Sequence, residues 1–220
     1  MELYLNAIKP NIVTSVGSLS NKKMELLDGF LLQDYPKRQS PISSTVIYFD
    51  PVNRKNVIVG PNQIGFGVDG KPHLTEDIPQ RISEWRVQSK KIAECLLLDP
   101  DCIGHEFEIS GRVNAHGQGN KSAANQSVQK FSSVSNKNFK ERIGVSPVAV
   151  GIRYIFKRDK FLWDCATEPL MADLSQFTLT ANIKIDQGKY SFDQVFDNLE
   201  TCIKFFTDEW FVFIKNEILI

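Results

Sequence analysis

Apolar and polar residues alternate at every second position in several short segments of the chain, a pattern that is typical of strands. In the first half, segments 45–49, 56–59 and 63–68 are rich in β-branched and apolar residues, and turn residues such as Gly60-Pro61-Asn62 separate them. These segments predict an antiparallel meander. Weaker alternation over 2–8 predicts a strand near the start, with 12–19 continuing it or pairing with it.

The helical period of 3.6 residues governs two other segments of the first half. Segment 22–33 follows a candidate N-cap, Ser20, and the segment after Asp77 has Pro79 in its first turn. Gln80 stands three residues after Asp77, which predicts a capping box there. Segment 35–40 contains Pro36 and predicts a loop. The apolar faces of the two helices consist of Met24, Leu27, Phe30 and Leu31, and of Ile82, Trp85, Ile92, Ala93 and Leu96.

The second half repeats this plan. Segment 105–113 alternates as a strand, 148–156 and 161–165 predict a hairpin, and 177–185 predicts another strand. Ser191 and Gln194 predict a second capping box at the start of a helix. The apolar face of that helix consists of Phe192, Val195, Phe196, Leu199, Ile203 and Phe206.

The combined pattern predicts an α+β fold, with amphipathic helices packed on one face of a mostly antiparallel sheet. The length of 220 residues allows one large domain over 1–220. Two related meander-plus-helix halves, 1–100 and 101–220, are the alternative, and the residue identity between them is low.

Charge changes this picture, because the basic residues are concentrated in the middle of a chain with no net charge. Segment 112–160 holds ten Lys or Arg residues against two acids, Glu141 and Asp159. Within it, 114–138 contains no acid and consists mostly of Asn, Ser, Gln and Gly. Such a segment buries too little apolar surface to offset the entropy of ordering, so we predict a flexible polar loop.

The basic stretch is the strongest functional candidate. On a strand, Tyr154 and Phe156 share one face while Arg153 and Lys157 share the other. Aromatic rings flanked by cations are typical of base-stacking platforms, and also of an edge hairpin with its rings in the core. The sequence predicts a non-enzymatic binding or assembly protein whose partner is nucleic acid or an acidic protein. The candidate binding residues are Lys121, Lys130, Arg153, Tyr154, Phe156, Lys157, Arg158 and Lys160.

Catalytic chemistry has weaker support. Glu106 and Glu108 share one face of a predicted strand, opposite His105. A solvated strand face explains them, and the alternative is a hydrolase or nuclease that uses both carboxylates with a divalent ion. Cys102 and His105 form a C-x-x-H pair without a second pair of ligands, so no metal site is predicted. No cofactor is predicted either.

A third interpretation is self-association through the aromatic end of the chain, 210–214 and 218–220, which is apolar enough for an interface. The chain shows no export signal and no stretch apolar enough to span a membrane. Its four cysteines are sparse and irregularly spaced, which favours reduced thiols. We therefore expect a cytoplasmic protein.

Two stretches carry a family resemblance: Gly151 to Ile155, and Val57 to Ile64. They resemble segments of a sporadically distributed, uncharacterised family of bacterial proteins of about this length. The closing helix that runs into an aromatic tail is also similar. Such families often occur with mobile or defence-linked genes. The chain departs from the family pattern at Phe156, where the family tends to carry Asn. The resemblance implies no known activity or functional residues and bears on localisation rather than mechanism.

Overall fold

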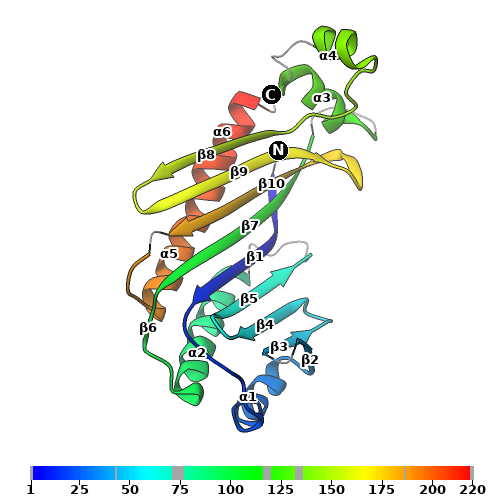
Figure 1. Cartoon of the computed structure of the whole chain (residues 1–220). Helices are drawn as coiled ribbons and strands as arrows, with labels where there is room; N and C mark the ends of the chain where they lie inside the picture. The colour runs from blue at the N-terminus through cyan, green and yellow to red at the C-terminus, as the bar shows by residue number, and fades with distance from the viewer. Residues whose placement is uncertain are drawn as a thin grey trace.

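Alternating apolar residues turn one side of most strands toward a common core, and the strands assemble into one large antiparallel sheet. The computed structural model describes residues 2–42, 44–70, 77–115, 120–131, 136–185 and 187–218. The large sheet has the order β2-β3-β4-β5-β1-β7-β10-β9-β8 (Figure 1). Its strands are β1 (Leu3–Val13), β2 (Lys37–Ile42), β3 (Thr45–Asp50), β4 (Lys55–Gly60), β5 (Gln63–Asp69), β7 (Gly104–Asn114), β8 (Ile152–Arg158), β9 (Phe161–Leu170) and β10 (Asp173–Ile185). A short pair, β6 (Asp101–Cys102) with β11 (Tyr190–Ser191), lies outside it.

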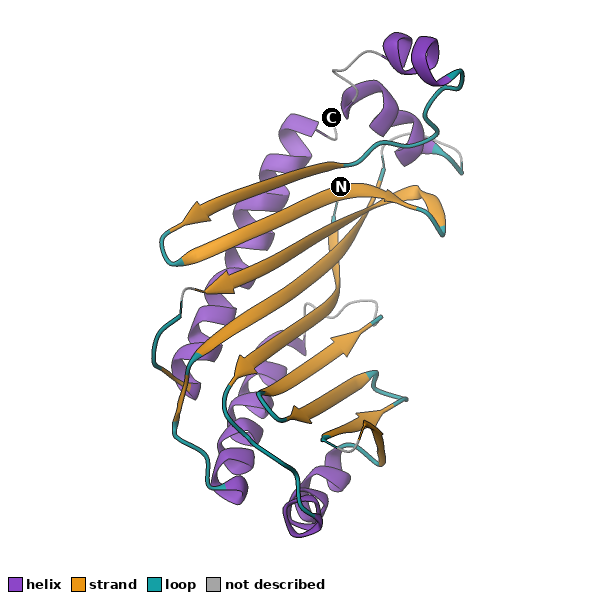
Figure 2. Ribbon diagram, in the orientation of Figure 1, coloured by secondary structure: helices purple, strands orange, loops and turns teal. Residues whose placement is uncertain are grey.

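Helices cover one face of this sheet, and the other face is uncovered (Figure 2). The helices of the fold are α1 (Asn21–Asp34), α2 (Ile78–Leu96), α3 (Ser122–Phe131), α4 (Asn136–Ile143) and α5 (Phe192–Lys204). Of these, α4 lies beyond the end of the sheet rather than on it (Figure 1). The last helix continues through η2 (Phe205–Trp210), α6 (Phe211–Phe213) and η3 (Ile214–Ile218), of which η2 and η3 are π-helical. The predicted α+β fold is therefore confirmed. Within the described residues, no helix is both long and apolar enough to cross a membrane.

The helix starts follow the predicted caps with one exception. Ser20 accepts a hydrogen bond from the backbone of Lys23, and Ser191 forms the complete predicted capping box with Gln194. Asp77 was predicted to cap α2 in the same way, but its side chain makes no capping hydrogen bond. Its backbone is already helical, with φ −92° and ψ −7°, so the side chain does not reach the next amides as an extended N-cap residue does.

The order of elements repeats in the two halves of the sheet. The first half runs β1, α1, the meander β2 to β5, then α2; the second runs β7, α3 and α4, the meander β8 to β10, then α5. In each half the first strand is central and pairs with the last strand of its own meander, and β1 and β7 pair with each other. The halves are thus topologically equivalent around the β1–β7 junction, with β2 as an additional edge strand.

One continuous core joins the two halves. Phe66 of β5 lies between the two central helices, with its ring centroid 6.0 Å from that of Trp85 in α2 and 6.1 Å from that of Phe196 in α5. All three side chains are buried. Because burying an aromatic side chain contributes about 1.5–3 kcal/mol, this contact ties the stability of each half to the other.

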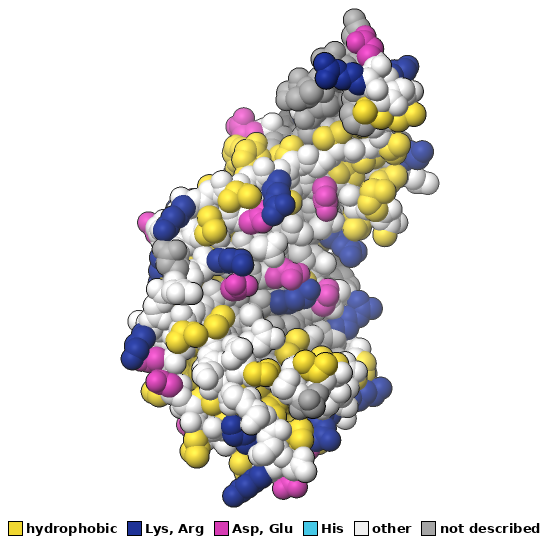
Figure 3. Space-filling model, viewed as in Figure 1, with side chains coloured by type: hydrophobic (Ala, Val, Ile, Leu, Met, Phe, Trp, Pro, Cys, Tyr) yellow, Lys and Arg dark blue, Asp and Glu magenta, His cyan; other side chains and the backbone are white. Residues whose placement is uncertain are grey.

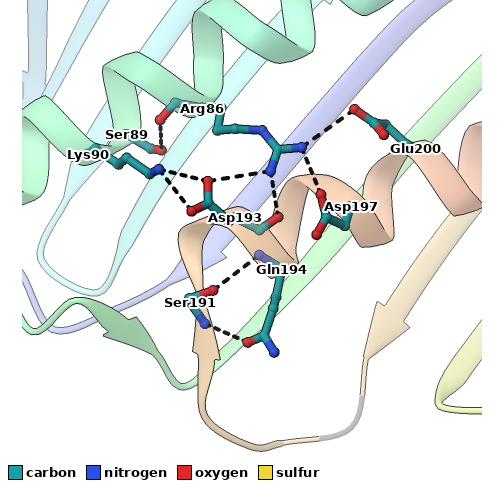
Figure 4. A network of polar contacts seen from close by, with 8 residues as sticks. All are labelled: Arg86, Ser89, Lys90, Ser191, Asp193, Gln194, Asp197 and Glu200. Atoms are coloured by element: carbon teal, nitrogen blue, oxygen red, sulfur yellow. Dashed lines mark hydrogen bonds and ion pairs between the residues drawn. The ribbon is translucent and has the colours of Figure 1, made fainter.

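A polar seam connects α2 and α5 at the edge of that core (Figure 4). Arg86 of α2 reaches Asp193, Asp197 and Glu200 of α5 at 3.4, 2.9 and 3.5 Å. Lys90, one turn further along α2, lies 2.8 Å from Asp193. The spacing of these acids along α5 places them on one helical face, where the two α2 cations meet them.

Two sequence predictions at the start of the chain are wrong. The predicted loop 35–40 overlaps β2, whose side chains are all exposed, so no alternation of burial marks it as a strand. The predicted strand 12–19 ends at Val13, because the amides of Val16 and Gly17 turn to the carbonyl of Pro61 instead of a strand partner.

Candidate binding surface

The predicted hairpin is present at one edge of the sheet, where β8 pairs only with β9 among the described strands. Its two aromatic residues point to the helix-covered face. Phe156 stacks on Trp163, with centroids 6.1 Å apart, and also contacts the rings of Phe205 and Trp210. Phe156 thus packs the last helix against the sheet. This is the role in the core that the sequence analysis gave as the alternative to base stacking.

Tyr154 occupies the rim of the same aromatic cluster. Its centroid lies 5.6 Å from that of Trp210 and 6.1 Å from that of Phe213, both in nearly perpendicular, edge-on geometry. Its side chain is 44% exposed. Tyr154 therefore combines a packing role with a ring edge that a partner can reach.

The cations of the hairpin are largely neutralised by acids that lie elsewhere in the sequence. Arg153 forms a bidentate ion pair with Asp164 of β9, and this hydrogen bonding lowers the pKa of the Asp164 carboxyl. Arg158 pairs with Glu209 at 2.5 Å and lies over the ring of Phe205, and Lys157 also has an interaction partner. The local excess of positive charge in the sequence is therefore much smaller in space.

Lys160, at the turn of the hairpin, contacts two aromatic rings. Its ammonium lies 5.5 Å from the centroid of Phe161 and 5.8 Å from that of Tyr190. It also faces the buried His105, whose pKa is lowered to about 4 by burial and, to a smaller extent, by the charge of Lys160.

The predicted flexible loop is wrong over the part that the structure describes. Residues 116–119 and 132–135 lie outside the described residues, but Ser122–Phe131 forms α3 and Asn136–Ile143 forms α4. The small residues Ala123, Ala124 and Ser127 are buried on one side of α3, which packs against β10 and β9. Small side chains carry little apolar surface, so this segment has no apolar stripe by which a helix could be predicted. Its small side chains let the backbone of α3 approach the sheet closely.

Ser127 fixes α3 to the start of the hairpin. Its hydroxyl donates to the carbonyl of Ala124 at 2.7 Å and accepts from the amide of Val150 at 3.0 Å. The side chain is fully buried. This bond joins α3 to Val150, two residues before the first residue of β8.

Four cations of α3 and α4 differ from those of the hairpin. Lys121 directly precedes α3, Lys130 lies in its last turn, and Lys140 and Arg142 lie in the last turn of α4. Within the described part of the chain, none of these four side chains has an ion pair. Cations in a last turn face the negative end of the helix dipole, which stabilises them without removing their charge from solution. We call these four residues the basic end.

The centre of the uncovered face of the sheet carries side chains of both charges in close proximity (Figure 3). Lys9 contacts Glu108 at 2.8 Å and Asp69 at 3.6 Å, and Lys184 contacts Glu106 at 3.4 Å. Two adjoining hollows of about 530 and 390 Å³ share a wall formed by Asp164 and Asn182. Opposite charges alternate across this face, so it offers no net attraction to a polyanion.

The two candidate catalytic carboxylates lie on this face. As predicted from the strand period, Glu106 and Glu108 point away from His105, which is buried on the helix side 3.0 Å from the amide of Asn198. Each glutamate already has a lysine partner. In the described ranges, no group of three or more His, Cys, Asp or Glu side chains is placed to hold a metal ion. The hydrolase or nuclease alternative stays a prediction.

The aromatic end of the chain is partly used within the fold. Trp210 is buried against the hairpin, whereas Val212 and Phe213 are more than two-fifths exposed. Of these two, Phe213 contacts Tyr154. Residues 219 and 220 lie outside the described residues.

Sequence reasoning missed Lys140 and Arg142, although both stand in the acid-poor segment that it identified. It also missed Asp164 and Glu209, which neutralise the hairpin. Local sequence contains no signal for a partner 51 residues away, as between Arg158 and Glu209.

Comparison with known proteins gives no match: no protein-family model and no curated protein matches the chain. The resemblance to the uncharacterised bacterial family stays a prediction.

Proposed function

We propose that the protein is a non-enzymatic binding protein that holds an acidic partner, either nucleic acid or an acidic protein, at its basic end. The observation that carries the proposal is the contrast in ion pairing. Among the described residues, Lys121, Lys130, Lys140 and Arg142 have no ion-pair partner, whereas Arg153 and Arg158 are paired internally.

The physical basis is electrostatic. Unpaired cations that approach phosphates displace condensed counterions, so binding weakens as salt rises. A cation that already holds a carboxylate must first give up that partner, which reduces its net contribution. The basic end therefore supplies most of the attraction, and the hairpin cations Lys157 and Lys160 contribute a smaller part.

A salt titration with paired variants tests this proposal. Binding to single-stranded RNA, single-stranded DNA and heparin is measured at two salt concentrations. Replacing the four basic-end residues by Gln should reduce the logarithmic salt slope by up to about 0.7 per lost phosphate contact on a single strand. The matched control replaces Lys157, Arg158 and Lys160 by Ala.

Each result has a defined meaning. A large loss with the basic-end variant and a small loss with the hairpin variant supports the proposal. Binding to heparin but to neither nucleic acid would favour an acidic protein as the partner. Failure of the unaltered protein to bind any probe at low salt would overturn the proposal.

The proposal includes a location in the cytoplasm. It is supported by the four cysteines, all of which are free thiols: Cys102, Cys165 and Cys202 are buried and Cys95 is partly exposed.

A further inference from the structure

The two edges of the sheet are protected to different degrees. At one edge, β2 contains Pro41 and its register with β3 shifts between Gln39 and Ile42. Proline and irregular register are devices that prevent another strand from adding to an edge. At the other edge, β8 has no proline and pairs with β9 in unbroken register from Ile152 to Arg158. No described strand pairs with the outer side of β8.

The charges near β8 do not prevent two copies of it from approaching. Arg153 is held by Asp164, and Arg158 is held by Glu209. An edge strand with unpaired cations would repel its own copy, because like charges opposite one another destabilise a strand pair. Here the internal acids reduce that repulsion without abolishing it, so a second copy can approach this edge in a register that keeps the remaining cations apart.

Exposed apolar side chains border the edge on both faces of the sheet. Ile155 is 64% exposed and Leu162 is 42% exposed on the uncovered face. On the helix face, Tyr154 is 44% exposed and Phe213, which contacts it, is 41% exposed. Apolar side chains grouped around an unprotected edge are typical of an interaction site.

We propose that two copies of the chain associate through β8, antiparallel and about a two-fold axis at Tyr154. The two sheets then form one continuous sheet, and the rings at Tyr154 and Phe213 of both copies meet on the helix face. Isologous two-fold contacts are the commonest form of homo-oligomer. This proposal rests on the edge and its apolar border, and is independent of the basic end.

The register of the proposed β8–β8 pair follows from the faces to which its side chains point and from the charges on β8. In an antiparallel pair, two residues directly opposite each other point to the same face of the sheet. An axis between two neighbouring residues of β8 would pair side chains from opposite faces, so the two-fold axis must pass through a residue of β8. An axis at Ile155 would place Arg153 opposite Lys157 of the second copy, which like charges disfavour. An axis at Tyr154 places Arg153 opposite Ile155 of the second copy and moves the Lys157 side chains apart. The two Tyr154 residues then lie directly opposite each other.

Solution mass and cysteine cross-linking test the interface and its register. The full chain should sediment at about 50 kDa, twice the 25.0 kDa of one copy. Two variants, Tyr154→Cys and Ile155→Cys, are made in a Cys95→Ser background, because Cys95 is the one partly exposed native thiol. Directly opposite positions fit disulfide geometry, so Tyr154→Cys should cross-link at least about tenfold faster than Ile155→Cys.

A third variant distinguishes a loss of dimerisation from a loss of folding stability. Ile155→Lys adds a charge at the edge without changing a buried position, so it should give a monomer with an unchanged chemical melt and unchanged heparin binding. A monomeric unaltered protein at all accessible concentrations would overturn the proposal. So would a dimer that Ile155→Lys leaves intact. Faster cross-linking of Ile155→Cys would overturn the Tyr154 register.

Discussion

The two halves of the molecule share an order of elements but differ in what joins the first strand to the meander. In the first half this segment is α1, with two lysines and three acids, and its Leu27 and Leu31 are buried. In the second half it is α3 and α4, which together hold four basic residues and one acid. A common scaffold thus carries a charge-balanced connection on one side and a basic one on the other. Where equivalent parts differ, we expect the difference to carry function rather than stability.

The largest expected effect tests what the halves have in common. Because Phe66 contacts both Trp85 and Phe196, the central helices share a core. Phe196→Ala and Trp85→Ala should each cost about 3–5 kcal/mol of unfolding free energy. Denaturant melts monitored by fluorescence and by circular dichroism should coincide in one transition.

Val212→Ala is the control for these two variants, since Val212 is largely exposed in the same terminal helix. It should change the melt by less than about 0.5 kcal/mol. Two separate transitions in either core variant would show that the halves unfold independently.

A smaller effect is expected at Ser127, which fixes the basic connection to the scaffold. Ser127→Ala leaves the partly buried amide of Val150 without its acceptor and should cost about 1–2 kcal/mol. Hydrogen exchange should accelerate in α3 but not in α1. Equal acceleration in both helices would mean that the serine supports the whole core rather than this connection.

The seam between the halves should contribute about 1 kcal/mol at low salt, since Arg86 and its acids are only partly shielded. Lys90 and Arg86 lower the pKa of Asp193 below its usual value. A lowered folded-state pKa stabilises the fold above the usual carboxyl range, and this stabilisation is lost as pH falls through the folded pKa.

Arg86→Met should therefore flatten the fall in stability between about pH 5 and pH 2. Arg81→Met is a matched control on α2, because Arg81 pairs with Glu84 of its own helix. Identical acid profiles for the two variants would contradict a seam between α2 and α5.

The sequence was sufficient for the parts of this comparison that depend on local periodicity. Ser191 with Gln194, and the apolar stripe that follows, predicted α5 because capping and burial both act within a few residues. Strand β2 and helix α3 escaped prediction for the opposite reason. β2 exists through its neighbour β3, and α3 docks through small side chains that resemble a loop composition.

The candidate site was predicted in outline but not in its distribution of charge. A basic stretch over 112–160 is visible in the sequence, whereas its division into paired and unpaired cations depends on Asp164 and Glu209. Asp164 meets Arg153 only because β8 and β9 pair in this register. Glu209 meets Arg158 only because the last helix crosses behind the hairpin. Neither contact has a local signature.

The smallest expected effect concerns the hairpin cations themselves. Replacing Lys157, Arg158 and Lys160 by Ala should change stability by less than about 1 kcal/mol, because exposed ion pairs contribute little. Polyanion binding should fall much less than in the basic-end variant, since Arg158 is held by Glu209. Parallel salt titrations of both variants measure this ratio.

If the hairpin variant loses more binding than the basic-end variant, Glu209 must release Arg158 when a partner arrives, and the binding site lies on the hairpin. The variant Glu209→Gln then distinguishes the two sites, because it frees Arg158. Polyanion binding should become stronger if the site lies on the hairpin and stay unchanged if it lies at the basic end.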